Sequence, residues 1–245
     1  MKKAVLVTGG SRGIGAATAR KLAEAGYAVC INYMRDARSA GEVVSGITRA
    51  GGTAIQIQAD VSDEHAVARM FAEIDDKFGA LYGLVNNAAI IGDQATLTDM
   101  SPDRIRRIFE VNVFGTFLCS KEAVKRMSAG LGGAGGAIVN ISSGASISGS
   151  PNEYIDYAAS KGAIDTFTRG LAREVAKNNI RVNAIRPGFI ETEIHRIPGR
   201  LEAAKHQIPM GRVGQPEEIA GAVLWLLSDQ ASYTTGTIID VAGGK

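Results

Sequence analysis

Tyr157 and Lys161 stand four positions apart within residues 154–177, a segment whose pattern predicts a long helix. Positions i and i+4 of a helix lie on one face. A free tyrosine has a pKa of about 10, and a lysine ammonium beside it lowers that pKa toward the range useful for proton transfer. The pair therefore predicts a general acid/base, although Tyr-x-x-x-Lys also arises by chance and is weak alone.

A glycine-rich segment, Gly9-Gly10-Ser11-Arg12-Gly13-Ile14-Gly15, follows a predicted strand and opens a predicted helix. Glycine lets the backbone approach a pyrophosphate, and a helix N-terminus supplies free N–H groups and the positive end of a dipole. The spacing departs from G-x-G-x-x-G, and a purely structural turn is the alternative. The strand–turn–helix context favours dinucleotide binding.

Two further polar positions are candidates for the same site. Asn112 falls on the apolar stripe of a helix predicted over residues 102–127, so its amide must find partners inside the protein. That stripe contains Ile105, Ile108 and Phe109. Ser142 and Ser143 end a predicted strand, where a serine either caps a turn or faces a ligand.

The elements that would position these residues alternate along the chain. Strands are predicted at 3–8, 28–32, 54–58, 81–88, 137–143, 180–187 and 237–241, with helices between them and a loop with a short helix at 188–212. Val- and Ile-rich strands alternating with helices predict an α/β fold with a doubly wound parallel sheet. Ligands of such sheets bind at the carboxyl ends of the strands, where the polar candidates lie.

Composition and charge exclude several classes of protein. The 245 residues carry 27 basic and 25 acidic side chains, a net charge of +2, so neither nucleic acid nor an anionic membrane is an expected partner. No apolar run is long enough to span a membrane or form a signal peptide, which predicts a cytoplasmic protein. Cys30 and Cys119 form no CxxC and the histidines no HExxH, so neither a disulfide nor a metal site is expected.

Taken together, these positions resemble the short-chain dehydrogenases/reductases. Each motif is weak alone, but they occur in the family's order and spacing along essentially the whole chain. The matching residues are Thr8 through Gly15, Asp60, Asn86-Asn87-Ala88, Asn112, Ser143, Tyr157, Lys161, Pro187-Gly188, Ile190 and Thr192. The resemblance implies an NAD(P)-dependent oxidoreductase built as one Rossmann-type catalytic domain over residues 1–245.

The resemblance also implies a catalytic role for four residues. Tyr157 would be the general acid in reduction and the base in oxidation. Lys161 would hold the nicotinamide ribose and depress the Tyr157 pKa. Ser143 would bind the substrate oxygen, and Asn112 would anchor a water in a proton relay. The segment before Tyr157 is one residue longer than is usual in the family, so Ser142 stays open as an alternative to Ser143.

The cofactor site that the resemblance implies runs across several loops. Asp60 and Val61 would bracket the adenine, and Asn87 and Ala88 would border a ribose. Ala89 stands where the family usually has glycine. The remaining expected cofactor residues are Gly9, Ser11, Arg12, Gly13, Ile14, Gly15, Tyr33, Arg35, Tyr157, Lys161, Pro187, Gly188, Ile190 and Thr192.

The residues after the second predicted strand bear on which cofactor is used. An NAD-preferring site needs an acid there to accept from the ribose hydroxyls. Tyr33 occupies that position, while Arg12 and Arg35 could attract a 2′-phosphate. We therefore expect NADP(H) rather than NAD(H). If the strand runs longer than predicted, Asp36 would be the acid.

The predicted function is hydride transfer between NADP(H) and a carbonyl or secondary alcohol of a small molecule. A 3-oxoacyl-[acyl-carrier-protein] reductase-like enzyme and an NAD-dependent sugar or polyol dehydrogenase remain open, as does a non-catalytic dinucleotide-sensing protein on the same fold. An acidic carrier protein would favour a basic docking patch. Lys125 and Arg126 are candidates for it, but residues 128–137 carry no charge.

Two helices predict self-association. Residues 219–228 are apolar almost all round, and the helix at 154–177 also carries many apolar side chains. A lone domain would expose part of this surface. Closed symmetry, together with the family resemblance, predicts a homotetramer.

Overall fold

The structure is a computed structural model that describes residues 2–193 and 200–245. These residues form a seven-stranded sheet in the order β3-β2-β1-β4-β5-β6-β7, and every neighbouring pair is parallel. The strands are β1 (Ala4–Val7), β2 (Ala28–Tyr33), β3 (Thr53–Gln58), β4 (Leu81–Asn86), β5 (Gly136–Ile141), β6 (Ile180–Pro187) and β7 (Ile238–Val241). The predicted doubly wound α/β fold is confirmed.

The strand order places a crevice beside β1. The chain builds outward from β1 to β3 and then returns to add β4 on the other side of β1. Connections leave β1 and β4 in opposite directions, so a ligand can enter between them at their carboxyl ends. The glycine-rich segment follows β1 and the Asn86-Asn87-Ala88 segment begins at the end of β4.

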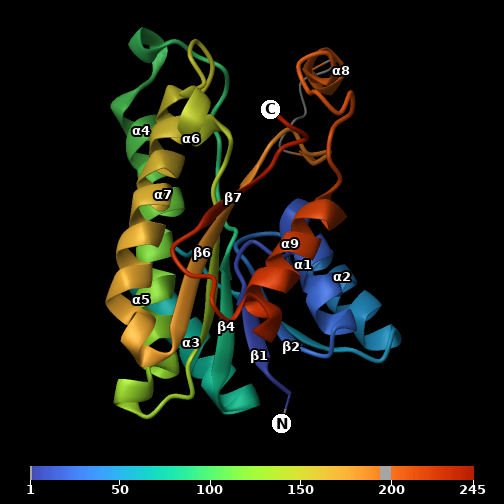
Figure 1. Cartoon of the computed structure of the whole chain (residues 1–245), viewed down its shortest axis with the longest axis vertical. Coiled ribbons are helices and arrows are strands. Elements are labelled where there is room, and N and C mark those ends of the chain that lie inside the picture. Colours follow the sequence, from blue (N-terminus) through green and yellow to red (C-terminus); the bar gives the residue numbers. More distant parts are fainter. Residues whose placement is uncertain (1, 194–199) are drawn as a thin grey trace.

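Helices cover both faces of the sheet (Figure 1). One face carries α1 (Gly13–Glu24), α2 (Ala37–Arg49) and α9 (Pro216–Leu227), and the other carries α3 (Glu64–Phe78), α5 (Gly115–Met127) and α7 (Ile155–Val175). Each helix turns an apolar stripe to the sheet, as Val67, Met70, Phe71 and Ile74 do from α3. Parallel strands buried on both faces explain the nearly continuous apolar runs of the sequence.

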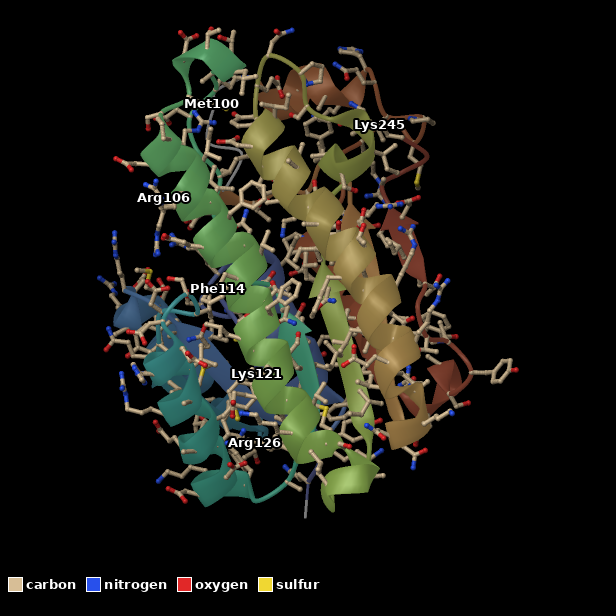
Figure 2. The ribbon with its side chains drawn as sticks, turned by 90° about the vertical axis from the view of Figure 1, so that its left-hand side faces the viewer. Met100, Arg106, Phe114, Lys121, Arg126 and Lys245 are labelled. Atoms are coloured by element: carbon tan, nitrogen blue, oxygen red, sulfur yellow. The ribbon has the colours of Figure 1, made fainter. Side chains whose placement is uncertain are left out.

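The helix predicted over 102–127 is one helical run with an interruption at Asn112. It comprises α4 (Pro102–Phe109), a π-helical turn η2 (Glu110–Phe114) and α5. Figure 2 shows this run lying beside α7. The expectation that Phe109 shares the buried stripe with Asn112 is wrong: Phe109 is 36% exposed and Asn112 is buried. The π turn adds a residue to the repeat, which breaks the i, i+3, i+4 pattern at this point.

The remaining elements follow the predictions with small differences. The expected short helix after β6 is α8 (Arg200–Lys205), whereas α6 (Ala145–Ser148), between β5 and α7, was not predicted. Cys30 and Cys119 are buried free thiols, and burial raises the pKa of each to about 12. Within the described residues, no helix combines the length and the apolar character that crossing a membrane needs.

Candidate active site

A cavity of about 1270 Å³ opens at the carboxyl edge of the sheet. It extends from the glycine-rich segment past the end of β4 to Tyr157 and Lys161 on α7. Of the residues predicted for the site, all line this cavity except Asn112 and Tyr33. Groups that are far apart in the sequence are therefore brought to one continuous surface.

The glycine-rich segment lies closer to its neighbours than a side chain would allow. A Cβ atom on Gly15 would stand 2.4 Å from the carbonyl oxygen of Gly9, and Gly9 itself has φ +60°. Arg12, the N-cap residue of α1, makes no side-chain capping bond. The first N–H groups of α1 thus border the cavity from a surface kept bare of Cβ atoms, which fits a pyrophosphate.

Two polar side chains hold this segment in place. Asn32, at the buried end of β2, accepts from Gly9 N at 3.2 Å and donates to the carbonyl oxygen of Ala59 at 3.0 Å. Asn87 donates from Nδ2 to the carbonyl oxygens of Thr8 and Gly9 at 2.9 and 3.1 Å. Sequence reasoning missed Asn32, because a buried asparagine inside an apolar strand carries no signal of its partner.

The part of the cavity next to the end of β3 contains a charged cluster. The Asp60 carboxylate accepts from Ser62 N at 2.9 Å and from Arg107 Nη2 at 2.9 Å. Partial burial raises the pKa of Asp60, but the hydrogen bonds from Ser62 and Arg107 outweigh it and hold that pKa below its usual value. Asp60 is thus an anion in a fixed orientation. Arg107, from α4, is a further cavity residue that sequence reasoning missed.

The end of β2 differs from the expectation. The strand reaches Tyr33, one residue further than predicted, and the Tyr33 side chain packs against the core beneath α1, α2 and α9 instead of lining the cavity. Met34, Arg35 and Asp36 line the cavity there. The Asp36 carboxylate caps α2 by accepting from Ser39 N at 2.9 Å, and this bond lowers the Asp36 pKa. Arg12 makes an exposed ion pair with Glu193 at 3.3 Å.

At the opposite end, Ser143 lies beside the Tyr157 hydroxyl and acts to lower its pKa. Ser142 points away from Tyr157: its hydroxyl donates to Asp165 Oδ1 at 2.6 Å, and the residue is buried. Ser143 lies at the end of β5, which brings it against the first turn of α7. Of the two serines left open by the sequence, the geometry places Ser143 at the tyrosine.

Lys161 is buried and donates from Nζ to the carbonyl oxygen of Ile141 at 2.7 Å. Its ammonium lies 5.6 Å from the centroid of the Tyr157 ring. Burial lowers the Lys161 pKa to about 8, although the nearby Asp165 carboxylate opposes the change. Burial raises the Tyr157 pKa and Ser143 acts against it, while the lowering of this pKa by Lys161 stays a prediction.

Asn112 lies behind the cavity wall, on the π turn. Its Oδ1 accepts from Ile90 N at 2.8 Å, and its Nδ2 donates to the carbonyl oxygen of Ile90 at 3.0 Å and to Ser160 Oγ at 3.0 Å. The amide therefore ties the segment after β4 to α7. The predicted partners inside the protein are present, and they fix Ile90, which lines the cavity.

Among the described residues, no three His, Cys, Asp or Glu side chains cluster as metal ligands would. Two of the three histidines, His65 and His206, belong to this described part, and His195, considered for the substrate pocket, lies outside it. What the described cavity provides is a bare backbone surface for phosphate, a tyrosine hydroxyl held by a serine, and a lysine beside it. This combination can bind a dinucleotide and exchange a proton with an oxygen placed next to Tyr157.

Comparisons with known proteins agree with this arrangement. Residues 9–245 match the family model described as enoyl-(acyl carrier protein) reductase. The chain is 58% identical to the uncharacterized oxidoreductase YgfF of Escherichia coli (strain K12), covering 98% of each chain. It is 40% identical to a 3-oxoacyl-[acyl-carrier-protein] reductase of Synechocystis sp. (strain ATCC 27184 / PCC 6803 / Kazusa), covering 98% of this chain and 95% of the relative.

A solved structure shows the same fold. The crystal structure of a dehydrogenase/reductase from Sinorhizobium meliloti 1021 superposes with a TM-score of 0.93 at 35% identity, covering 99% of this chain and 94% of that one. The family uses NAD(P)(H) as its cofactor, and the relatives named above are oxidoreductases. Sequence, cavity and comparisons thus agree, and the chain belongs to the short-chain dehydrogenase/reductase family.

Proposed function

We propose that this enzyme transfers a hydride between NADP(H) and a small carbonyl or secondary alcohol, with Tyr157 as the general acid/base. One observation carries the proposal: Tyr157 and Ser143 line the same cavity whose other end is the glycine-rich backbone. A dinucleotide bound along that cavity would bring its nicotinamide toward Tyr157.

The side chains near α7 have different roles around the substrate oxygen. The nicotinamide supplies or accepts the hydride. Ser143 and Tyr157 orient the substrate oxygen by hydrogen bonds, and Tyr157 gives it a proton in reduction or removes one in oxidation. Because burial raises the Tyr157 pKa, the hydroxyl keeps its proton near neutral pH, which suits a proton donor. Lys161 holds the nicotinamide ribose, and Asn112 supports the wall at Ile90 and takes part in the proton relay.

The rest of the cofactor would lie along the lining residues predicted from the sequence. Gly9, Gly13 and Gly15 border the pyrophosphate with Ser11 and Ile14, and Asp60 and Val61 border the adenine. Asn87, Ala88 and Ala89 lie along a ribose. The residues on the β6 side, which would hold the carboxamide and the pyrophosphate, are Pro187, Gly188, Ile190 and Thr192.

The preference for NADP(H) rests on charge at the adenosine end. Arg12 and Arg35 both line the cavity there, and Asp36 is engaged as the cap of α2. An arginine pairs well with a 2′-phosphate, whereas a capping carboxylate has already used an oxygen that would accept from a ribose hydroxyl. Tyr33 takes no part, because its half-buried side chain packs against the core and does not line the cavity.

The substrate is best described as a small free carbonyl compound or alcohol. The basic patch considered for a carrier protein is already paired: Arg126 contacts Asp75 and Glu122 at 2.8 and 2.6 Å, and Lys125 contacts Glu122 at 2.6 Å. A 3-oxoacyl-carrier substrate is the second candidate, supported by the similarity to the Synechocystis reductase.

The test is a screen of carbonyls and alcohols with NADPH, NADH and their oxidised forms, followed by nicotinamide absorbance. We expect turnover with a free carbonyl compound, and the Tyr157→Phe variant should lose about 10²–10⁴-fold in turnover while keeping its cofactor affinity. A Tyr157→Phe enzyme with near-normal turnover would contradict the role of the tyrosine. Turnover confined to carrier-linked substrates would favour the second candidate.

A homotetramer is part of the same proposal. Phe114 and Phe117 on the π turn and α5 are 52% and 46% exposed, and the ring centroids of Phe117 and Phe167 on α7 lie 4.1 Å apart with their planes tilted by 35°. Trp225 of α9 is 38% exposed. Exposed aromatic side chains grouped on helices are typical of association surfaces. Light scattering should give four subunits, and a stable monomer at micromolar concentration would contradict this.

A further inference from the structure

A buried ion pair lies one helical turn beyond Lys161. Arg186, near the end of β6, donates to Asp165 Oδ2 on α7 from Nε at 3.0 Å and from Nη2 at 2.8 Å. The two side chains are only 13% and 6% exposed. Removing two charges from water is costly, and apolar residues of similar volume often stabilise a protein as well as a buried ion pair does. A buried pair at this place therefore calls for a role other than stability.

The ion pair reaches Lys161 by two routes. Asp165 follows Lys161 by four residues, so the two side chains share a face of α7. Asp165 Oδ1 also accepts from Ser142 Oγ at 2.6 Å, and this hydroxyl lies 3.3 Å from the carbonyl oxygen of Lys161. The residue before Ser142 is Ile141, whose carbonyl oxygen accepts from Lys161 Nζ at 2.7 Å.

We propose that Asp165 and Arg186 are positioning residues for Lys161, with two effects. The pair fixes the end of β5 against α7, so that the Ile141 carbonyl holds the lysine amine in place. The Asp165 carboxylate, held in place by Arg186, presents its negative charge on the face of α7 that carries the lysine amine. The inference rests on the proposed function in one respect, the role of Lys161 toward the nicotinamide ribose.

The charges around Lys161 make this effect measurable. The described titratable or charged groups that face it are Tyr157 and Asp165 on α7, Arg186 on β6 beyond Asp165, and Asp240 on β7, 3.6 Å from Arg186. Burial brings the Lys161 pKa to about 8 against the opposing effect of Asp165. Near that pH the amine is partly protonated, so a change in either partner alters its charge directly.

The test is ¹³C NMR of lysine side chains in the cofactor-free protein, with the Lys161 signal assigned through Lys161→Arg. Asp165→Asn removes an anion and leaves Arg186, so the Lys161 pKa should fall by about 1 pH unit or more. Arg186→Gln removes a cation and leaves Asp165, so the pKa should rise. A merely structural role of the ion pair would not shift the Lys161 pKa in opposite directions in the two variants.

A matched control is available on the same helix. Asp156 forms another buried Arg–Asp pair of α7, with Arg104 Nε at 2.7 Å, and it lies five residues before Lys161, off the helix face that Lys161 shares with Asp165. Asp156→Asn should lower the melting temperature as Asp165→Asn does, yet leave the Lys161 titration in place. If either single variant fails to fold, the double variant Asp165→Asn/Arg186→Gln buries no unpaired charge. It should still lower the Lys161 pKa, because Asp165 is the nearer partner.

Three results would overturn the proposal: an unchanged Lys161 titration in all variants, shifts of the same sign in Asp165→Asn and Arg186→Gln, or an equal shift in Asp156→Asn. The pH at which kcat/KM changes on the alkaline side is a separate measurement. If the Lys161 pKa shifts as expected in the variants but this pH does not shift with it, the positioning role is supported. The role of Lys161 in the proposed function is then contradicted.

Discussion

The two ends of the cavity hold their groups by different physical means. At the glycine-rich end the surface is mostly backbone, and the charged side chains beside it, Arg12 and Glu193, are 57% and 58% exposed. At the α7 end the groups that we propose to react are side chains. Lys161 and Ser142 are buried there, Ser142 bonded to Asp165 and Lys161 to the end of β5.

This difference sets what a mutation can do at each end. An exposed ion pair in water contributes little, because solvent and salt screen it. A buried polar group that loses its partner costs the full desolvation of that group, and neighbouring hydrogen bonds are disturbed with it. Changes at the α7 end should therefore affect turnover strongly, and changes at the glycine-rich end should affect the affinity and choice of cofactor.

The largest expected effect separates two adjacent serines at the α7 end. Ser143→Ala removes the hydroxyl beside Tyr157, so turnover at saturating cofactor should fall by about 10²–10³-fold, as when one donor to a reacting oxygen is lost. Ser142→Ala should cost less, because its hydroxyl serves Asp165. Steady-state kcat of both variants is the measurement, and a larger loss in Ser142→Ala would reverse the assignment.

The next effect tests the backbone surface. Gly15→Ala places a Cβ 2.4 Å from the Gly9 carbonyl oxygen, so the loop must shift, at a cost of about 1–3 kcal/mol in cofactor binding. The kcat at saturating cofactor should change little. Gly46→Ala is the control, because its Cβ on α2 would meet open space. The measurement is the cofactor Kd of both variants by titration. Equal Kd values for Gly15→Ala and the unmutated enzyme would show that the cofactor does not depend on the close packing of the backbone at Gly15.

A third effect concerns stability at the buried lysine. The Lys161 pKa is about 8 in the folded protein and 10.5 as the reference value, so between these pH values the unfolded chain binds more protons than the folded one. The contribution of Lys161 to the free energy of unfolding therefore rises as the pH increases from 8 to 10.5. Below pH 8 the buried amine is a cation, and its burial destabilises the folded protein most. Lys161→Met should be more stable by about 2 kcal/mol at pH 7, allowing for the lost bond to Ile141.

Urea unfolding of Lys161→Met and the unmutated protein at pH 7, 8.5 and 10 would check this trend. The stability difference should shrink as the pH rises. A Lys161→Met protein that is less stable at pH 7, or a difference independent of pH, would show that the lysine is not buried as a costly cation.

The smallest effect lies at the exposed end. Arg12→Ala and Arg35→Ala should each weaken NADPH binding more than NADH binding, by about 1 kcal/mol for contacts open to solvent. Since Arg12 already pairs with Glu193, Glu193→Gln should strengthen NADPH binding slightly. Fluorescence titration with both cofactors at low and high salt is the measurement. Comparable affinities in the unmutated enzyme, or tighter NADH binding, would show that neither arginine reads the phosphate.

Much of the site could be predicted because its signals are local. The glycine-rich segment after β1 and the Tyr157–Lys161 spacing depend on residues a few positions apart. The alternation of apolar strands with amphipathic helices likewise predicted the parallel sheet and the edge at which these residues meet. Local sequence could not show the π turn at Asn112 or the burial of the Tyr33 side chain, because both depend on packing against other elements.

The sequence by itself determined which residues we propose for the chemistry and along which edge of the sheet they lie, since their local spacing, the hydrophobic period and the turn composition are all written in it. Only the tertiary structure decided how those residues are held. Asp60 meets Arg107 across 47 positions, and Asp165 meets Arg186 across 21. Strand order and helix packing bring such partners together, and burial then sets the pKa of Tyr157 and Lys161. No spacing in the sequence reports either, because desolvation is a property of the packed interior.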